Sequence, residues 1–310
     1  MKLEQFIREQ AFALGFGAVG IAAAGPSKSF PAFNEWLSRG CCGGMDYLKK
    51  RAALRADPRN LAPQAKSIIV AAAPYPAEQN DCPISNYARG ADYHDVVRAK
   101  LKQLSAALDA KTGRACGGRV CVDSAPLAER EWAVRAGIGW IGRQGSVVNP
   151  EIGCCFFLGE LMVNIALEPD RELRPQCGAC RLCVDACPAG AIMPGNCVDA
   201  RRCISYLTVE HKGGLDPARQ PFAGNSIFGC DCCTAVCPWN RRRPAPVMPE
   251  FDVPPSVVPP LAELAALNQE EFAKKFSGTP VERIGLERFL RNVNLALKGH
   301  NNPEEQNYEH

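Results

Sequence analysis

The sequence lacks a long apolar segment. Its first residues, MKLEQFIREQ, contain no apolar stretch of the kind that a secretory signal peptide carries. The longest weakly polar run, from Gly15 to Gly25, is too short and too rich in glycine to span a bilayer. We therefore expect a cytoplasmic protein with no membrane partner, in a reducing compartment where disulfides do not persist.

A strong excess of charge of either sign is also missing. The 36 Lys and Arg residues nearly balance the 33 Asp and Glu residues, which gives a net charge of +3. This charge is too small to indicate any particular partner. The hydrophobic fraction of 46% is ordinary for a soluble globular protein, and 310 residues are typical of about two domains.

Cysteine, in contrast, is abundant. The chain has 17 cysteines, and ten of them fall between residues 171 and 245. An odd number cannot pair completely into disulfides. In a reducing compartment, clustered cysteines are metal ligands more often than disulfide partners.

Composition divides the chain into three regions, and the whole predicts an α+β protein. Residues 1–170 alternate apolar strands with amphipathic helices, as expected of an α/β or α+β domain. Residues 171–245 form the cysteine-rich region. Residues 246–310 begin with a proline-rich connector and carry a helical pattern that ends in a polar, frayed terminus.

Apolar periodicity predicts the main elements of the first and last regions. In the first region we expect helices over residues 3–14, 97–108 and 124–136, and strands over residues 67–73 (SIIVAAA), 119–123 (RVCVD) and 156–165 (FFLGELMVNI). In the last region we expect short helices over residues 261–268, 268–276 and 280–297.

The cysteine spacing indicates iron–sulfur clusters. Cys177, Cys180, Cys183 and Cys187, followed by Pro188, form the run C-x2-C-x2-C-x3-C-P. This run is typical of bacterial ferredoxins, in which the fourth cysteine binds the other of two clusters. Structural zinc is the alternative, but a zinc ribbon uses two separated pairs rather than one compact run.

A second run, Cys230, Cys233 and Cys237 before Pro238, is one cysteine short of a full set, and Cys203 can complete it. Following the crossed arrangement of ferredoxins, we expect Cys177, Cys180, Cys183 and Cys237 to hold one [4Fe-4S] cluster, and Cys187, Cys203, Cys230 and Cys233 to hold the other. Cys197 could replace Cys203, whereas Cys232 breaks the C-x2-C spacing. The remaining cysteines have no ligand spacing, and we expect them to be small buried residues: Cys41, Cys42, Cys82, Cys116, Cys121, Cys154 and Cys155.

Several further segments resemble one protein family. With the first cysteine run, the segments RRCISYLTVEHKG, GCDCCTAVCPWNR, MDYLKKR, ARGADYH, VDSAPLAERE, AGIGWIGR, FFLGEL and FLRNVNLAL are similar to those of the epoxyqueuosine reductases, over nearly the whole chain. The resemblance implies a cobalamin bound by a domain of flavin- and corrinoid-reductase type, beside two [4Fe-4S] clusters. It implies reduction of epoxyqueuosine to queuosine at the wobble position (34) of tRNA, the last step of queuosine biosynthesis.

The resemblance also implies roles for individual residues. Asp123 matches the catalytic acid, which fits a reaction that opens an epoxide, provided that burial raises the pKa of this carboxyl. Alternatively, Asp123 caps the helix that we expect from residue 124. The implied cofactor-binding residues are Arg51, Tyr87, Asp92, Tyr93, His94, Gly139, Trp140, Gly142, Ser205 and His211. Glycines among them would let the backbone approach a planar macrocycle.

Two features depart from the family. Family members often have Lys-His after the GWxG motif, where this chain has Arg143-Gln144. Several relatives also have a longer helical C-terminal extension that grips tRNA, so a chain that stops at His310 would have a smaller footprint. Basic residues that could contact tRNA phosphates, or could form an ordinary solvated face, are Arg201, Arg202, Arg241, Arg242, Arg243, Arg283, Arg288, Arg291 and Lys298.

Two other functions remain open from the sequence. One is a cobalamin-dependent reductive dehalogenase, although such proteins usually carry an export signal. The other is a non-catalytic electron carrier, in which Asp123 would have no chemical role. In either case we expect a monomer that receives electrons from an unidentified donor.

Overall fold

The computed structural model describes residues 1–310 except 77–81, 216–224, 243–247, 254–257 and 301–310. Part of the predicted proline-rich connector, the predicted tRNA contact Arg243 and the predicted frayed terminus lie outside the described residues. Among the described residues, no helix is both long enough and apolar enough to cross a membrane.

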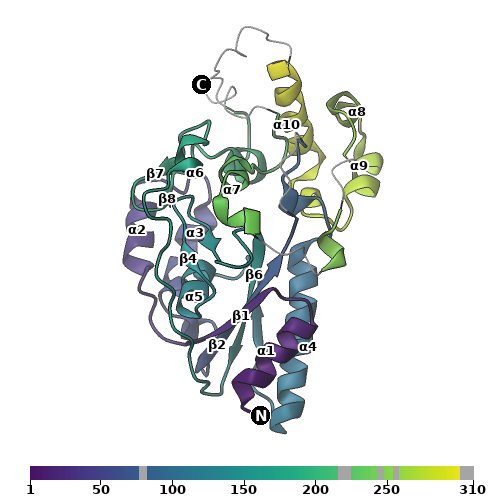
Figure 1. Ribbon diagram of the computed structural model, residues 1–310. Coiled ribbons are helices and arrows are strands. Elements are labelled where there is room, and N and C mark those ends of the chain that lie inside the picture. The colour runs from purple at the N-terminus through teal and green to yellow at the C-terminus, as the bar shows by residue number, and fades with distance from the viewer. Residues whose placement is uncertain (77–81, 216–224, 243–247, 254–257, 301–310) are drawn as a thin grey trace.

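A four-stranded antiparallel sheet forms the centre of the first region (Figure 1). Its order is β1 (Ala18–Ala23), β2 (Ser67–Pro74), β6 (Phe156–Val163) and β3 (Arg119–Cys121). Every residue of β2 is buried, as the unbroken apolar run SIIVAAA predicts for a central strand. All pairings are antiparallel, so the α+β class is confirmed, whereas the α/β alternative for this region is wrong.

Helices cover both faces of this sheet. Helices α1 (Leu3–Ala13) and α4 (Tyr93–Thr112) pack on one face, and α5 (Glu129–Arg135) packs on the other. The predicted apolar stripe of α4 is confirmed, because Val97 and the three leucines that follow it at helical spacing are fully buried. Alternate residues of β2 and β6 therefore face either α4 or α5.

The segment between β3 and α5 differs from its prediction. The expected strand ends at Cys121, and the expected helix begins only at Glu129. Asp123 interrupts both elements because its φ of 53° lies in the left-handed region. The Ser124 N–H donates to the Val122 carbonyl at 2.6 Å, which closes a three-residue turn. Asp123 does not cap α5, so this alternative for its role is wrong.

Short elements position the cysteine-rich region. Helices α6 (Leu182–Asp185) and α7 (Cys232–Ala235) contact each other. Two small hairpins lie nearby, β4 (Trp140–Ile141) with β5 (Val147–Val148) and β7 (Ile192–Met193) with β8 (Cys197–Val198). Two helices of the first region, α2 (Phe30–Ser38) and α3 (Asp46–Lys50), and a π-helix (Tyr206–Glu210) complete this part of the fold.

The C-terminal region packs as three helices against the rest of the chain (Figure 1). They are α8 (Leu261–Ala265), α9 (Gln269–Phe276) and α10 (Gly285–His300). Asn268 caps α9 in a capping box, which explains where this helix begins. The predicted helices are confirmed, except that residues 280–284 form a 3-10 turn before α10.

Candidate active site

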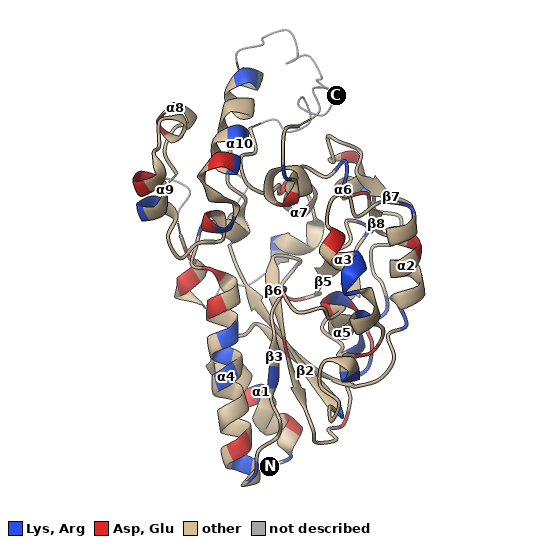
Figure 2. Ribbon diagram, turned by 180° about the vertical axis from the view of Figure 1, so that it is seen from behind, with Lys and Arg blue, Asp and Glu red and all other residues tan. Residues whose placement is uncertain are grey.

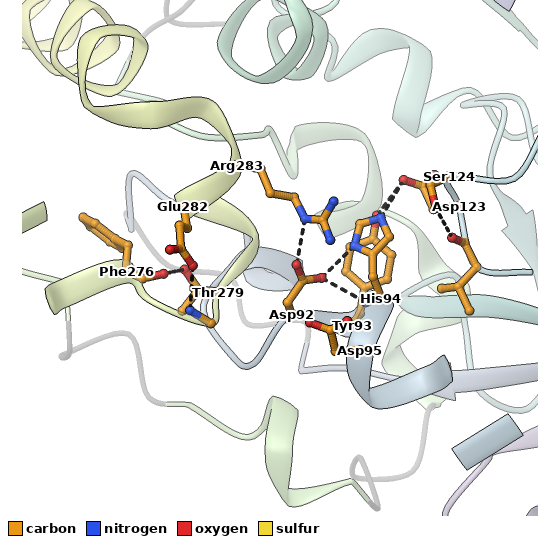
Figure 3. Close-up of polar contacts among 12 residues, drawn as sticks. Asp92, Tyr93, His94, Asp95, Asp123, Ser124, Phe276, Thr279, Glu282 and Arg283 are labelled. Carbon is orange, nitrogen blue, oxygen red and sulfur yellow. Dashed lines mark hydrogen bonds and ion pairs between the residues drawn. The ribbon is translucent and has the colours of Figure 1, made fainter. Parts of the chain in front are cut away.

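The start of α4 brings two side chains to Asp123 and a third to His94 (Figure 3). Oδ2 of Asp123 lies 3.1 Å from Nε2 of His94 and 3.0 Å from the hydroxyl of Tyr93, which donates to it. Asp92 caps α4 by accepting the backbone N–H of His94 at 2.9 Å. The ring of Tyr93 stacks on Phe157 of β6, which fixes its position. The structure therefore brings together four predicted site residues.

A chain of hydrogen bonds continues from His94 to the C-terminal region (Figure 3). Nδ1 of His94 lies 2.6 Å from Oδ1 of Asp92, and Oδ2 of Asp92 accepts from Nε of Arg283 at 2.7 Å. Burial works to raise the pKa of Asp92, but the hydrogen bonds from Arg283 and His94 outweigh it and lower that pKa. Asp92 is therefore an acceptor at neutral pH, and Nδ1 of His94 carries a proton toward it.

This arrangement determines what His94 and Asp123 can exchange. With Nδ1 of His94 as a donor, a hydrogen bond between Nε2 and Oδ2 of Asp123 requires one proton between the two atoms. The histidine and the carboxyl thus hold one transferable proton together. Burial and then the negative charge of Asp123 raise the pKa of Tyr93 far above its usual value. The hydroxyl of Tyr93 therefore keeps its proton and donates it to Asp123 in a hydrogen bond.

The expected increase in the pKa of Asp123 is not found. Surrounding protein atoms work to raise this pKa, but the hydrogen bond and charge of His94 and the hydrogen bond from Tyr93 lower it below its usual value. The condition that burial raises this pKa is therefore wrong. The proton for an acid step has to come through the hydrogen bond to His94 rather than from burial alone.

The carboxyl of Asp123 is exposed, although several elements surround it. Its side chain is 61% exposed, yet side chains from several elements act on it. Tyr47 of α3, Arg55 of the following 3-10 turn and Glu210 at the end of the π-helix all feel its charge. Burial, followed by Glu210 and Asp123, raises the pKa of Tyr47 to about 12. The carboxyl of Asp123 is therefore accessible from solvent and lies among side chains of three further elements.

Two acids that the sequence did not reveal lie beneath Asp123. The backbone N–H of Asp123 donates to Oε1 of Glu129, the first residue of α5. Glu160 of β6 is fully buried beside Glu129. The only signal in the sequence was a charged residue inside the apolar segment FFLGEL.

Four predicted ligands surround one cavity. Cys177, Cys180, Cys183 and Cys237, here called the first cysteine group, line a cavity of about 300 Å³. Nε1 of Trp140 donates to Sγ of Cys177 at 3.4 Å. Burial, and then the three neighbouring thiols, raise the pKa of Cys183 because neighbouring thiolates repel one another.

The other four predicted ligands form the second cysteine group. Burial and then Cys203, with Cys187 a smaller cause, raise the pKa of Cys233, and Cys233 in turn acts on Cys230. The competitor Cys197 lies away from this group, beside Cys41. Cys232 is exposed and contacts Cys230 at the edge of the group.

The first cavity suits an iron–sulfur cluster better than a single ion. No group of three or more histidine, cysteine or acidic residues in the described part of the chain is arranged to hold one metal ion. Nε of Arg143 and Nε2 of Gln144 belong to residues lining the cavity, and both are buried without an acceptor among the described residues. Inorganic sulfide in a cluster would accept from such N–H groups. Arg143 and Gln144, which depart from the family pattern, therefore line the cavity of the first cysteine group.

The remaining predicted cofactor residues separate into two sets. Trp140 contacts Cys177 of the first cysteine group. A Cβ on Gly139 or Gly142 would lie within 3 Å of Val148. These glycines therefore allow β4 to pack on β5, and the prediction that they face a macrocycle is not supported. Arg51 ends α3, and Ser205 and His211 flank the π-helix, so these three lie on elements that surround Asp123. Tyr87 lies edge-on to Tyr93.

Two further contacts near the first cysteine group were missed. Cys154 and Cys155 are buried, as predicted, but Cys154 contacts Cys237. Asn240 accepts the backbone N–H of Cys154 at 2.8 Å and donates to Sγ of Cys155 at 3.4 Å. The sequence gives no spacing signal for this contact, because it joins residues more than 80 positions apart.

Several predicted phosphate contacts are used within the chain. Arg283 binds Asp92, Arg288 donates to the Val209 carbonyl at 2.7 Å, and Arg291 donates to three carbonyls between residues 207 and 213. Arg201 forms an ion pair with Asp199. Figure 2 shows basic and acidic segments interspersed along α4 and α10 rather than a stripe of one sign.

Comparison with known proteins gives a consistent result. The family described as "Epoxyqueuosine reductase QueG, DUF1730" matches residues 55–124, and a "4Fe-4S double cluster binding domain" matches residues 176–240. The epoxyqueuosine reductase of Alicycliphilus denitrificans is 40% identical over 92% of this chain and 83% of its own.

Two solved structures are similar along nearly the whole chain. One is an epoxyqueuosine reductase with an epoxyqueuosine-modified tRNA-Tyr stem loop, with 33% identity and a TM-score of 0.88 over 96% of this chain and 81% of that one. The other is the epoxyqueuosine reductase of Bacillus subtilis with its catalytic aspartate loop swung out of the active site. It has 32% identity and a TM-score of 0.86 over the same shares.

Proposed function

Because the chain belongs to the epoxyqueuosine reductase family, we propose that it reduces epoxyqueuosine in tRNA to queuosine, with Asp123 and His94 supplying protons. The observation that carries the proposal is the hydrogen bond between Oδ2 of Asp123 and Nε2 of His94, in a chain that also gathers two groups of four cysteines. The reaction consumes two electrons and two protons and converts an epoxide into an alkene and water.

The residues of the chain have separate tasks in this reaction. When the epoxide opens, its oxygen becomes an alkoxide, which must be protonated before water can leave. Asp123 is exposed to the site and shares a proton with His94, so it can deliver this proton. Asp92, held by Arg283, keeps a negative charge on the far side of His94 and holds its ring toward Asp123.

The donor sets fit the cofactors that the family implies. We assign one [4Fe-4S] cluster to the first cysteine group and the other to the second, and we place cobalamin above Asp123, near Arg51, Tyr87, Ser205 and His211. When bound, the clusters would supply single electrons and cobalamin would supply a reduced cobalt centre that can act on the epoxide. The buried N–H groups of Arg143 and Gln144, which have no acceptor among the described residues, and the exposed carboxyl of Asp123 support these positions.

We also propose that the tRNA anticodon enters over Asp123. A relative has been solved with an epoxyqueuosine-modified stem loop, and a single splayed-out base can reach side chains that a duplex cannot. The Bacillus subtilis relative has a catalytic aspartate loop that can leave the active site. The turn around Asp123 is the equivalent segment in our proposal.

The test is a nucleoside analysis of tRNA from cells that lack this protein. Complementation with the wild type should convert accumulated epoxyqueuosine to queuosine, and Asp123→Asn should lower the rate by about 10²- to 10⁴-fold, the usual contribution of a general acid. The control is Asp95→Asn, an exposed aspartate on the same helix as His94. Full activity of Asp123→Asn would reject the proton-donor role and favour a protein that only carries electrons.

A further inference from the structure

Glu129 and Glu160, here called the buried acid pair, lie directly beneath the turn that carries Asp123. Glu160 pairs in register with Val70 of β2 and Cys121 of β3, so its side chain points to the face of the sheet that α5 covers. It is 0% exposed. Glu129 begins α5 and contacts Glu160 with its carboxyl group.

In the described part of the chain, no basic side chain forms a hydrogen bond with Glu160, and Arg130 acts on Glu129 only as a minor cause. Apart from the carboxyl of Glu129, neither carboxyl oxygen of Glu160 has a partner among the described residues. Two ionised carboxylates accept hydrogen bonds but cannot donate them, so contact between them requires a proton. Leaving two unpaired negative charges in an apolar layer is also costly. The geometry therefore points to one proton shared between the two carboxyls.

The surroundings of the pair agree with this arrangement. Burial and then the charge of Asp123 raise the pKa of Glu129 to about 8, and burial raises that of Glu160 far above its usual value. The other titratable or charged groups that act on the pair are Arg55 from the turn after α3, Tyr93 from α4, Cys121 from β3, and Asp123 and Arg130 beside it. Arg130 lowers the pKa of Glu129 only as a minor cause and donates to the Gly145 carbonyl.

The turn above the pair needs an external support. Asp123 has a φ of 53°, a conformation that costs a non-glycine residue free energy and persists only when neighbouring contacts hold it. Its backbone N–H donates to Glu129. This bond anchors the main chain of the turn, while His94 and Tyr93 hold only its side chain.

We propose that Glu129, neutralised by the proton that it shares with Glu160, is the positioning residue that holds Asp123 in its left-handed turn. The proposal rests on the proposed function, since it concerns the proton donor of that reaction. When the pair loses its proton, the two carboxylates repel each other, and Glu160 has no route to solvent. Glu129 then moves away from the Asp123 N–H, and the turn loosens.

Four variants separate this positioning role from a structural one. Glu129→Gln and Glu160→Gln keep a hydrogen bond between the two side chains, because an amide donates to the remaining carboxylate. Glu129→Ala removes the acceptor for the Asp123 N–H. Glu131→Gln is the matched control, since Glu131 is also on α5 but binds Ser27 and Ser29 instead.

The first measurement follows amide hydrogen exchange in the cluster-loaded protein. In Glu129→Ala, exchange of the Asp123 turn should be about tenfold faster, as expected for the loss of one hydrogen bond, while exchange of β6 stays the same. Glu129→Gln should keep the protection of the wild type. Unchanged exchange of the turn in Glu129→Ala would overturn the proposal.

The second measurement detects the shared proton by infrared spectroscopy. The wild type and Glu131→Gln should show a protonated-carboxyl band that is present at neutral pH and is lost only as the pH rises above about 8. Both Gln variants of the pair should lack this band change, and their alkene formation should lose the matching decrease above that pH. A band that persists in both variants would overturn the proposal. Wild-type turnover by Asp123→Asn would instead reject the proposed function and leave the infrared result intact.

Discussion

Arg283 connects the C-terminal region to the candidate active site. It binds Asp92, which holds Nδ1 of His94, which in turn meets Asp123. Motif resemblance identified His94 and Asp123 because they lie in short segments typical of the family. It could not identify Arg283, because 191 residues separate Arg283 from Asp92 and a lone arginine on a helix fits a phosphate contact equally well.

Replacing Arg283 should therefore affect catalysis rather than only tRNA affinity. Arg283→Met removes the cation that keeps Asp92 ionised, so His94 becomes a weaker proton partner for Asp123. We expect the rate of alkene formation at saturating tRNA to fall about tenfold, which corresponds to the loss of about 1.4 kcal/mol of stabilisation. Single-turnover kinetics at saturating substrate measures this change.

The control for this prediction is Arg98→Met. Arg98 pairs with the exposed Asp95 on the outer side of α4 and does not contact Asp92 or His94 in the described structure. An unchanged saturating rate in Arg283→Met, with only weaker tRNA binding, would show that the residue serves tRNA alone.

At the scale of elements, periodic segments were predictable and the catalytic turn was not. The stripe of α4 and the apolar run of β2 have one regular pattern each, and the structure forms both as expected. The segment DSAPLA contains the residue types of a helix start, yet the chain makes a left-handed turn there and begins α5 at Glu129. Tertiary contacts with Glu129 and His94 decide this conformation, and no local pattern encodes them.

The close packing of α5 on the sheet gives an element-scale prediction. A Cβ on Gly20 of β1 would lie 1.9 Å from the carbonyl oxygen of Ala136, just after α5. Gly20→Ala should force these elements apart and lower the free energy of unfolding by about 1–3 kcal/mol. Chemical denaturation of the protein measures the change.

Gly25→Ala is the matched control for Gly20→Ala. A Cβ at Gly25 would approach only the end of the Arg135 side chain, at 4.0 Å. We expect the free energy of unfolding of this variant to lie within about 0.5 kcal/mol of the wild-type value, as is usual for substitutions without a clash. Equal destabilisation by both substitutions would contradict the tight contact between β1 and the end of α5.

For the whole molecule, ferredoxin spacing predicted how distant segments meet. The first cysteine group joins Cys237 to a run that ends 50 residues earlier, and the crossed arrangement anticipated this. The contact of Cys154 with Cys237, held by Asn240, could not be predicted, because it depends on how the first region docks on the cysteine-rich region. Two arginines of α10 bind carbonyls of the π-helix and so hold the C-terminal region against the cysteine-rich region, which their basic character alone did not reveal.

The buried acid pair makes stability depend on pH across the whole molecule. The pKa of Glu129 is raised in the folded state from 4.5 to about 8, so the folded protein binds more protons than the unfolded chain between these values. The contribution of this group is fully present below pH 4.5 and is lost as the pH rises to about 8. We therefore expect the melting temperature of the wild type to fall as the pH rises from 4.5 to about 8.

The Glu129→Gln variant should show a flatter dependence of the melting temperature over that range, because it removes one titrating group. Glu131→Gln should keep the slope of the wild type. Parallel curves for the wild type and Glu129→Gln would mean that the acid pair is ionised throughout and does not hold a proton.

The central claim is that electrons from two clusters open an epoxide beside Asp123. The most direct measurement is a single turnover of anaerobically prepared, cofactor-loaded and chemically reduced protein with an epoxyqueuosine-containing tRNA stem loop, read by mass spectrometry of its nucleosides. The account predicts queuosine from the wild type and at least about a hundredfold slower formation by an equally loaded Asp123→Asn protein. Equal rates for the two proteins, or no queuosine from the loaded wild type, would contradict it.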